Sequence, residues 1–279
     1  GYIVLKAQDL INVRETAGDM NVKEATASAG DVILRAADSI LDDNNNQAAD
    51  VTGDSITLTA DSGTLGVKEN WLEINTKSGS GTLTGQSFGH SYIKEVSGDL
   101  SLNRVGAEDT TKEINDSTVY LVSPGQILNG RDDTGPNVVA GKVQLTANGD
   151  IGKQDKRLET EVGILEGRST TSDAWINNTG DLIIKPIDTD GAGLRIPGTA
   201  YVIANSNLTV DSEIVAETVV LTAKESSDTT KGDSILVNFA VSATGTPTAS
   251  DGEHKKGGIY IYAGDDVTVP EGVTVTAAS

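Results

Sequence analysis

The chain has 279 residues, with 41 Asp and Glu against 21 Lys and Arg, and its formal net charge is −20. It contains no cysteine, which excludes disulfides, thiolate metal sites and cysteine nucleophiles. No apolar run approaches the roughly 18 residues of a membrane-spanning helix, and the negative charge argues against nucleic acid or an anionic membrane as a partner.

Seven copies of one short pattern predict strands along the chain. Each copy reads as an apolar residue, any residue, Leu or Ile, any residue and a small residue. Alternation of this kind is typical of a half-buried β-strand, and Val, Ile and Thr favour its pleated surface. In chain order, the copies lie at 3–7, 32–36, 56–60, 119–123, 143–147, 219–223 and 259–263.

The stretches between these copies carry turn-forming residues. Gly-Asp pairs, which mark turns, begin at positions 18, 30, 53, 98, 149, 180, 232 and 264. Helical periodicity is weak and is confined to Lys156–Leu165. We therefore expect a chain that is nearly all β.

The spacing of the copies indicates a repeating fold. When the longer gaps are divided into several repeats, the spacing averages about 21 residues. Two or three short strands per repeat fit one coil of a parallel β-helix, in which each coil buries its inward residues against its neighbours. We predict an all-β solenoid, a parallel β-helix with coils of about 20 residues and variable loops. A pair of β-sandwiches stays open as the alternative.

Two stretches resemble the repeats of filamentous-haemagglutinin-type bacterial exoproteins, namely GDVILRAADSI at 30–40 and GKVQLTANGDI at 141–151. The resemblance implies a right-handed β-helical shaft that is exported through an outer-membrane partner and serves as an adhesin, a biofilm matrix protein or a toxin carrier. The sequence has neither the secretion domain at its start nor a toxin module at its end. Residues 1–279 are therefore expected to be a single solenoid segment from inside a larger exoprotein.

The expected location is extracellular, on the bacterial cell surface. A chain with no cysteine and one methionine suits an oxidising environment. The expected partners are an extracellular polysaccharide or a cell-surface receptor, and neighbouring copies of the chain. Nucleic acid and insertion of this segment into a membrane are not expected.

One loop carries several hard oxygen donors and is the best candidate for a cation. Its side chains are Asp42, Asp43, Asn44, Asn46 and Asp50, and calcium prefers carboxylate and amide oxygens. The competing interpretation is a turn rich in Asp and Asn. Apart from calcium, no cofactor is expected.

Exposed aromatic rings are candidates for carbohydrate contact, because sugar faces stack on them. Tyr260 and Tyr262 flank Ile261 and are expected to share the outward face of one strand. Trp71 and Trp175 are further candidates. The alternative is that these rings cover the edges of coils.

The same fold also carries polysaccharide lyases and hydrolases, so an enzyme is an alternative. The adjacent acid pairs at 42–43, 132–133 and 265–266 do not provide two catalytic groups on one face, since neighbouring strand residues point in opposite directions. No catalytic residue is therefore assigned, and the chain is expected not to be an enzyme. Three or more acids clustered beside a basic residue in a groove would favour the enzyme.

A phage tail-spike or fibre segment, which would form trimers, is a further alternative.

Overall fold

The computed structural model describes residues 1–77, 79–107, 117–188, 191, 193–225, 232–246 and 256–278. These residues form strands joined by turns and loops, without a helix among them. No helix in this part of the chain is long and apolar enough to cross a bilayer. The chain divides into two compact units, Gly1–Val143 and Gln144–Ser279.

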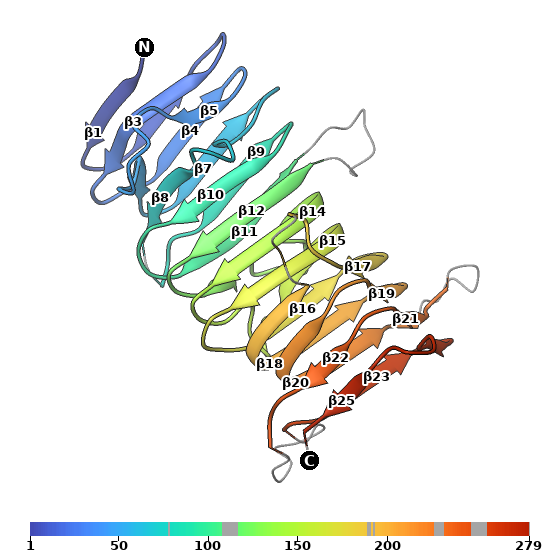
Figure 1. The fold of residues 1–279 in the computed structure, drawn as a ribbon. Helices are drawn as coiled ribbons and strands as arrows, with labels where there is room; N and C mark the ends of the chain where they lie inside the picture. Colours follow the sequence, from blue (N-terminus) through green and yellow to red (C-terminus); the bar gives the residue numbers. More distant parts are fainter. Residues whose placement is uncertain are drawn as a thin grey trace. The chain divides into compact units, whose positions relative to one another are not determined.

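The first unit is a stack of short parallel strands, coloured dark blue to green in Figure 1. Its strands are β1 (Ile3–Ala7), β2 (Ile11–Arg14), β3 (Met20–Ala27), β4 (Val32–Ala36), β5 (Ile40–Asp42), β6 (Val51–Gly53), β7 (Ile56–Ala60), β8 (Leu72–Thr76), β9 (Leu83–Ser87), β10 (Ser91–Glu95), β11 (Leu100–Ala107), β12 (Thr118–Ser123), β13 (Ile127–Asn129) and β14 (Val138–Ala147), the last of which runs past Val143. One column of parallel pairs runs β1–β3–β6–β8–β10–β12. A second runs β2–β4–β7–β9–β11.

The second unit repeats this architecture. Its strands are β15 (Leu158–Ser169), β16 (Ala174–Asn178), β17 (Leu182–Ile184), β18 (Leu194–Ala204), β19 (Leu208–Val210), β20 (Ile214–Ala223), β21 (Ile235–Val237), β22 (Val241–Ala243), β23 (Ile259–Ala263), β24 (Val267–Thr268) and β25 (Val275–Ala277). Different parts of β15 pair in parallel with β16, β17 and β18. A column β16–β18–β20–β23 then continues along the unit. Each unit is thus a β-solenoid, as the sequence predicts.

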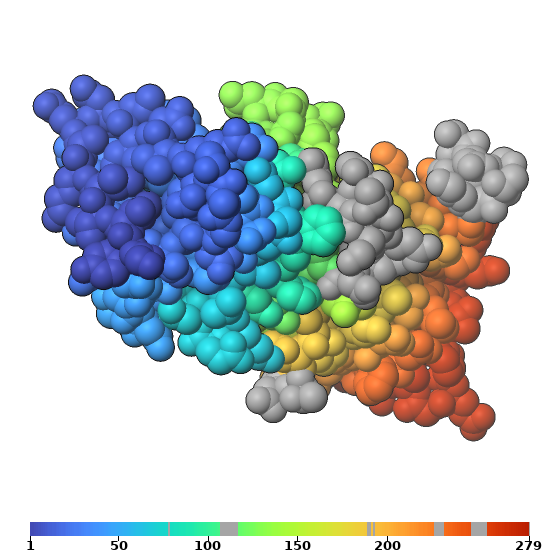
Figure 2. Space-filling view, turned by 90° about the horizontal axis from the view of Figure 1, so that it is seen from above, coloured from blue at the N-terminus to red at the C-terminus, as the bar shows by residue number. Residues whose placement is uncertain are grey.

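All seven predicted strands are present, because alternation is a local property of the chain. In β4, Val32, Leu34 and Ala36 are fully buried, whereas the residues between them face outward. Ala36 pairs with Ala60, and Ala60 pairs with Ser87, so small residues stack along one line of the interior. Figure 2 shows coils of the first unit following one another as bands of colour from dark blue to cyan.

Coil length varies more than the sequence spacing suggests. Leu83 pairs with Leu102, 19 residues later, and Leu158 pairs with Ile176, 18 residues later. Val219 pairs with Ile259, 40 residues later. The expected coil of about 20 residues describes the shortest coils, and the others are longer because loops are inserted between strands.

The weak helical periodicity at Lys156–Leu165 is a wrong indication. These residues enter β15, where Leu158, Thr160 and Val162 are buried and alternate with outward residues. Stacking on neighbouring coils decides the conformation here, because a period-two pattern buries these side chains against β16. The prediction of one solenoid over 1–279 stays a prediction.

Candidate functional site

Three buried carboxyl groups meet in the first unit: those of Asp42, Asp50 and Glu73, referred to below as the acidic cluster. One carboxylate oxygen of each lies within 4.8 Å of the others. Asp42 ends β5, Asp50 comes directly before β6, and Glu73 lies on β8 one coil later. The parallel pairing of Val51 with Ile74 brings Asp50 beside Glu73, and the Asp50 N–H donates to the Glu73 carbonyl at 2.8 Å.

Hydrogen bonds orient two of the carboxylates. The backbone N–H groups of Asn44 and Asn45 donate to the two oxygens of Asp42, each at 2.7 Å. Asp50 accepts the side-chain amide of Asn44 at 3.2 Å and the N–H of Glu73 at 3.1 Å. Asn45 has a φ of 46°, a left-handed conformation that Asn tolerates in such turns.

Glu73 is the least satisfied member of the acidic cluster. Its Oε1 lies 3.8 Å from the ammonium nitrogen of Lys94, its register partner on β10. Its Oε2 is fully enclosed and accepts no hydrogen bond from the described residues. The Lys94 ammonium also donates to the side-chain oxygen of Gln47.

Burial changes the pKa values of two members of the acidic cluster, Asp50 and Glu73. Removal from water, and then the charge of Asp42, raise the pKa of Asp50 to about 8, although the hydrogen bond from Glu73 opposes the change. Burial also raises the pKa of Glu73, and the charge of Lys94 opposes that change. Without a cation, burial therefore disfavours the charged forms of Asp50 and Glu73.

A pocket of about 260 Å³ opens beside Glu73. Its lining combines polar side chains with one large aromatic ring: Asn45, Gln47, Glu69, Asn70, Trp71, Glu73, Lys94 and Val122. The indole N–H of Trp71 donates to the Lys68 carbonyl at 3.0 Å, which fixes the ring at the wall of the pocket.

Trp71 belongs to an aromatic cluster with Tyr92 and Tyr120. The two tyrosines are register partners on β10 and β12, and their rings stack with centroids 4.6 Å apart and planes 9° apart. Trp71 meets them edge-on, at 5.8 Å and 6.1 Å. The three rings therefore hold each other in place beside the polar pocket.

The turn that places Trp71 recurs in the second unit. In the first unit, Gly66 has a φ of 67°, and Val67 and Asn70 exchange backbone hydrogen bonds. In the second, Gly152 has a φ of 69°, and Lys153 and Lys156 make the same exchange. Arg157 follows there in place of Trp71, and its guanidinium lies 4.9 Å from the ring centre of Tyr201, which stacks on Trp175 at 5.1 Å.

The structure brings together only part of the predicted calcium loop. Asp42 and Asp50 join the acidic cluster, but Asp43 is exposed and lies outside it. The side-chain oxygens of Asn44 and Asn46 accept backbone N–H groups within the loop, at 3.1 Å and 2.6 Å. Sequence reasoning missed Glu73, because only the register between β6 and β8 places it there.

Tyr260 and Tyr262 lie on β23 and alternate with Ile261, opposite Val220 and Thr222 of β20. Tyr262 is 48% exposed, and Tyr260 is half-buried. Their contact with carbohydrate stays a prediction. The aromatic cluster around Trp71 has the additional feature of a polar pocket beside it.

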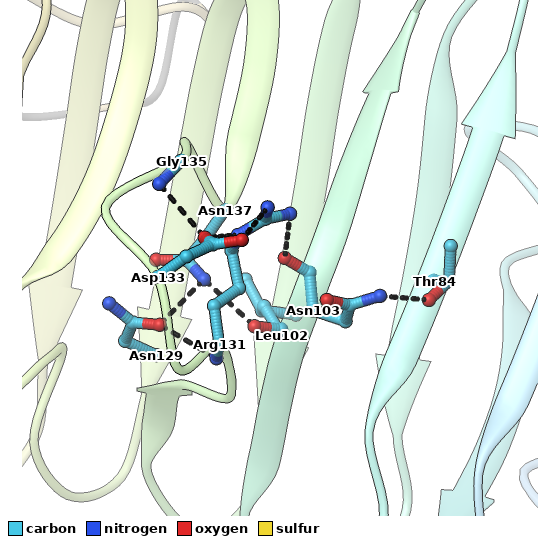
Figure 3. A network of polar contacts seen from close by, with 8 residues as sticks. All are labelled: Thr84, Leu102, Asn103, Asn129, Arg131, Asp133, Gly135 and Asn137. Atoms are coloured by element: carbon cyan, nitrogen blue, oxygen red, sulfur yellow. Dashed lines mark hydrogen bonds and ion pairs between the residues drawn. The ribbon is translucent and has the colours of Figure 1, made fainter.

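Asp133, of the acid pair at 132–133, serves the local structure of a loop (Figure 3). Asp133 receives two hydrogen bonds from the guanidinium of Arg131, at 2.6 Å and 2.8 Å, and one from the N–H of Gly135. The bonds from Arg131 lower the pKa of Asp133. The buried Asn137 ties the end of this loop to the Leu102 carbonyl and to Asn129.

Comparisons of the chain with protein-family models, with curated proteins and with solved structures found no match. The resemblance of 30–40 and 141–151 to haemagglutinin-type repeats therefore stays a prediction.

Proposed function

We propose that the chain is a structural and adhesive shaft segment of a secreted bacterial surface protein. The observation that supports this role is the stacking of coils by parallel pairing, with an interior of aliphatic residues, as in the column from β1 to β12. Each coil shares hydrogen bonds and apolar contacts with the next, so a pull on the unit is spread over many bonds. Outward positions stay available for contacts.

The pocket beside Trp71 is the adhesive surface in this proposal. An aromatic ring offers a face on which a sugar stacks, and amides and charged groups around it donate and accept hydrogen bonds. Trp71, Asn70, Gln47 and Lys94 provide these groups. We infer a neutral extracellular polysaccharide as the ligand, because a net charge of −20 repels polyanions.

Substitution of Trp71 tests the adhesive surface. We expect Trp71→Ala to weaken binding to a neutral polysaccharide on a glycan array at least tenfold, which is about 1.4 kcal/mol, because the stacking face is lost. Trp175→Ala is the matched control, since Trp175 stacks on Tyr201 in the second unit and does not line this pocket. Equal losses in both variants, or no binding by the unsubstituted chain, would refute the assignment.

One observation favours an enzyme as the second candidate. The acidic cluster brings three carboxyl groups together, and one of them, Glu73, lies 3.8 Å from Lys94 at a pocket. Clustered acids near a basic residue are the arrangement expected of a polysaccharide-cleaving solenoid. Release of new reducing ends from neutral or acidic polysaccharides would support it. Binding without any cleavage would support the adhesive role instead.

A further inference from the structure

We propose that the first unit binds one calcium ion between the carboxylates of Asp42, Asp50 and Glu73. This inference does not depend on the adhesive role. Its ligands come from two consecutive coils, because Asp42 and Asp50 flank the loop between β5 and β6, whereas Glu73 lies on β8. The ion would therefore tie that loop to the next coil, at the edge of the Trp71 pocket.

The distances fit a hard cation. Two oxygens that bind one calcium ion at about 2.4 Å each are separated by no more than about 4.8 Å. The three carboxylate oxygens satisfy this limit mutually. Each carboxylate oxygen of Asp42 and Asp50 accepts one of the hydrogen bonds described above, and such bonds orient metal ligands without using all their lone pairs.

Glu73 supplies an independent indication of a missing partner. The residue is only 2% exposed, yet its Oε2 receives no hydrogen bond from the part of the chain that the structure describes. A buried carboxylate oxygen without a partner is unfavourable, and buried charges in proteins are paired or coordinate metals. A cation between the three carboxylates provides that partner.

The charge of the acidic cluster also favours a bound cation. Of the three carboxyl groups in the acidic cluster, Glu73 has a cation near it, the ammonium of Lys94 at 3.8 Å, and that ammonium also donates to Gln47. Metal binding requires the three carboxyl groups to lose their protons, and one divalent cation together with Lys94 then balances their three negative charges. Oxygen-only ligands select calcium or magnesium over zinc and copper. The adjoining pocket has room for the waters that complete the six to eight ligands of calcium.

Calcium binding is testable on the full chain by thermal unfolding and by terbium luminescence. After removal of metals by a chelator at neutral pH, calcium should raise the melting temperature with a dissociation constant on the order of 0.1–1 mM, as for extracellular calcium modules. Terbium should bind at the same place and be sensitised by Trp71, which lines the pocket with Glu73. Calcium should displace it, and magnesium should do so at least tenfold less well.

The Glu73→Gln variant distinguishes a calcium site from a group of buried acids that binds no metal. The amide keeps the shape of the side chain and removes one charge, so the variant should melt higher than the unsubstituted chain without metal. Its calcium response and its terbium signal should both weaken at least tenfold. Glu69→Gln is the matched control, because Glu69 lines the same pocket, is exposed and lies outside the acidic cluster.

The control variant should respond to calcium as the unsubstituted chain does. The proposal is wrong if calcium at about 10 mM, ten or more times the expected dissociation constant, leaves the melting temperature unchanged. It is also wrong if Glu73→Gln keeps the full response, or if Glu69→Gln loses as much of it. A chain that binds calcium here but no polysaccharide would support the metal site and refute the adhesive surface.

Discussion

Glu95 is a buried acid that a hydroxyl and an amide satisfy. It is fully buried on β10, on the inward side with Ile93. The Thr76 N–H lies 3.2 Å and 3.1 Å from its two oxygens, and the Thr76 hydroxyl donates at 2.8 Å. Burial raises its pKa from 4.5 to about 7, although the bonds from Thr76 favour the charged form.

This pKa predicts that the stability of the fold depends on pH. The folded chain holds the Glu95 proton more tightly than the unfolded chain, so this contribution is complete below about pH 4.5 and is lost as the pH rises through about 7. The loss amounts to about 3 kcal/mol at most. Urea unfolding between about pH 4 and 8 should show a smaller decline for Glu95→Gln than for the unsubstituted chain. Identical pH profiles for Glu95→Gln and the unsubstituted chain would contradict the assignment of this pH dependence to Glu95.

The turns at Gly66 and Gly152 show how the elements are joined. Both have left-handed backbones, and both lie against the neighbouring coil. A Cβ on Gly152 would be 2.2 Å from the Trp175 carbonyl oxygen and 2.7 Å from the Leu158 nitrogen. Glycine is therefore needed for close approach as well as for the φ angle.

Gly152→Ala should destabilise the second unit by about 3 kcal/mol or more, because backbone atoms have to move in addition to the strain at positive φ. Gly180→Ala is a matched control, since Gly180 has a φ of 86° and nothing lies within 4 Å of its Cβ position. The control should lose only about 1–2 kcal/mol. Chemical denaturation measures both, and equal losses would show that φ alone accounts for the effect.

For the whole molecule, charge is the dominant property. The formal net charge of −20 on 279 residues destabilises the compact state by repulsion between like charges. Salt screens that repulsion, because the Debye length falls from about 30 Å at 0.01 M to about 10 Å at 0.1 M. Raising sodium chloride over this range without calcium should therefore raise the melting temperature. A flat or falling melting temperature would show that favourable ion pairs outweigh the repulsion.

Oligomeric state, measured on the same samples, bears on the proposed role. A single shaft segment should sediment as a monomer at moderate salt, since its acidic surfaces repel one another. A trimer in sedimentation equilibrium would instead support the tail-spike or fibre alternative. The measurement needs no knowledge of the ligand.

The strands of this protein could be predicted from alternation because inward and outward side chains are neighbours along the chain. Val32, Leu34 and Ala36 show it directly. Interior polar groups such as Asn178 were not predicted, since its oxygen meets the Val162 N–H and the Thr160 hydroxyl only after two coils stack. A local pattern contains no information about partners that lie a full coil away.

The same reason explains why two of the three residues of the acidic cluster could be predicted. Asp42 and Asp50 stand close in the sequence, so a cation loop was a reasonable prediction from residue types alone. Glu73 joins them because the coil that starts at Val51 returns with Ile74 beside it, and this offset is set by the lengths of the loops. Alternation determines the strands, but loop length determines the register, and the register decides which side chains meet.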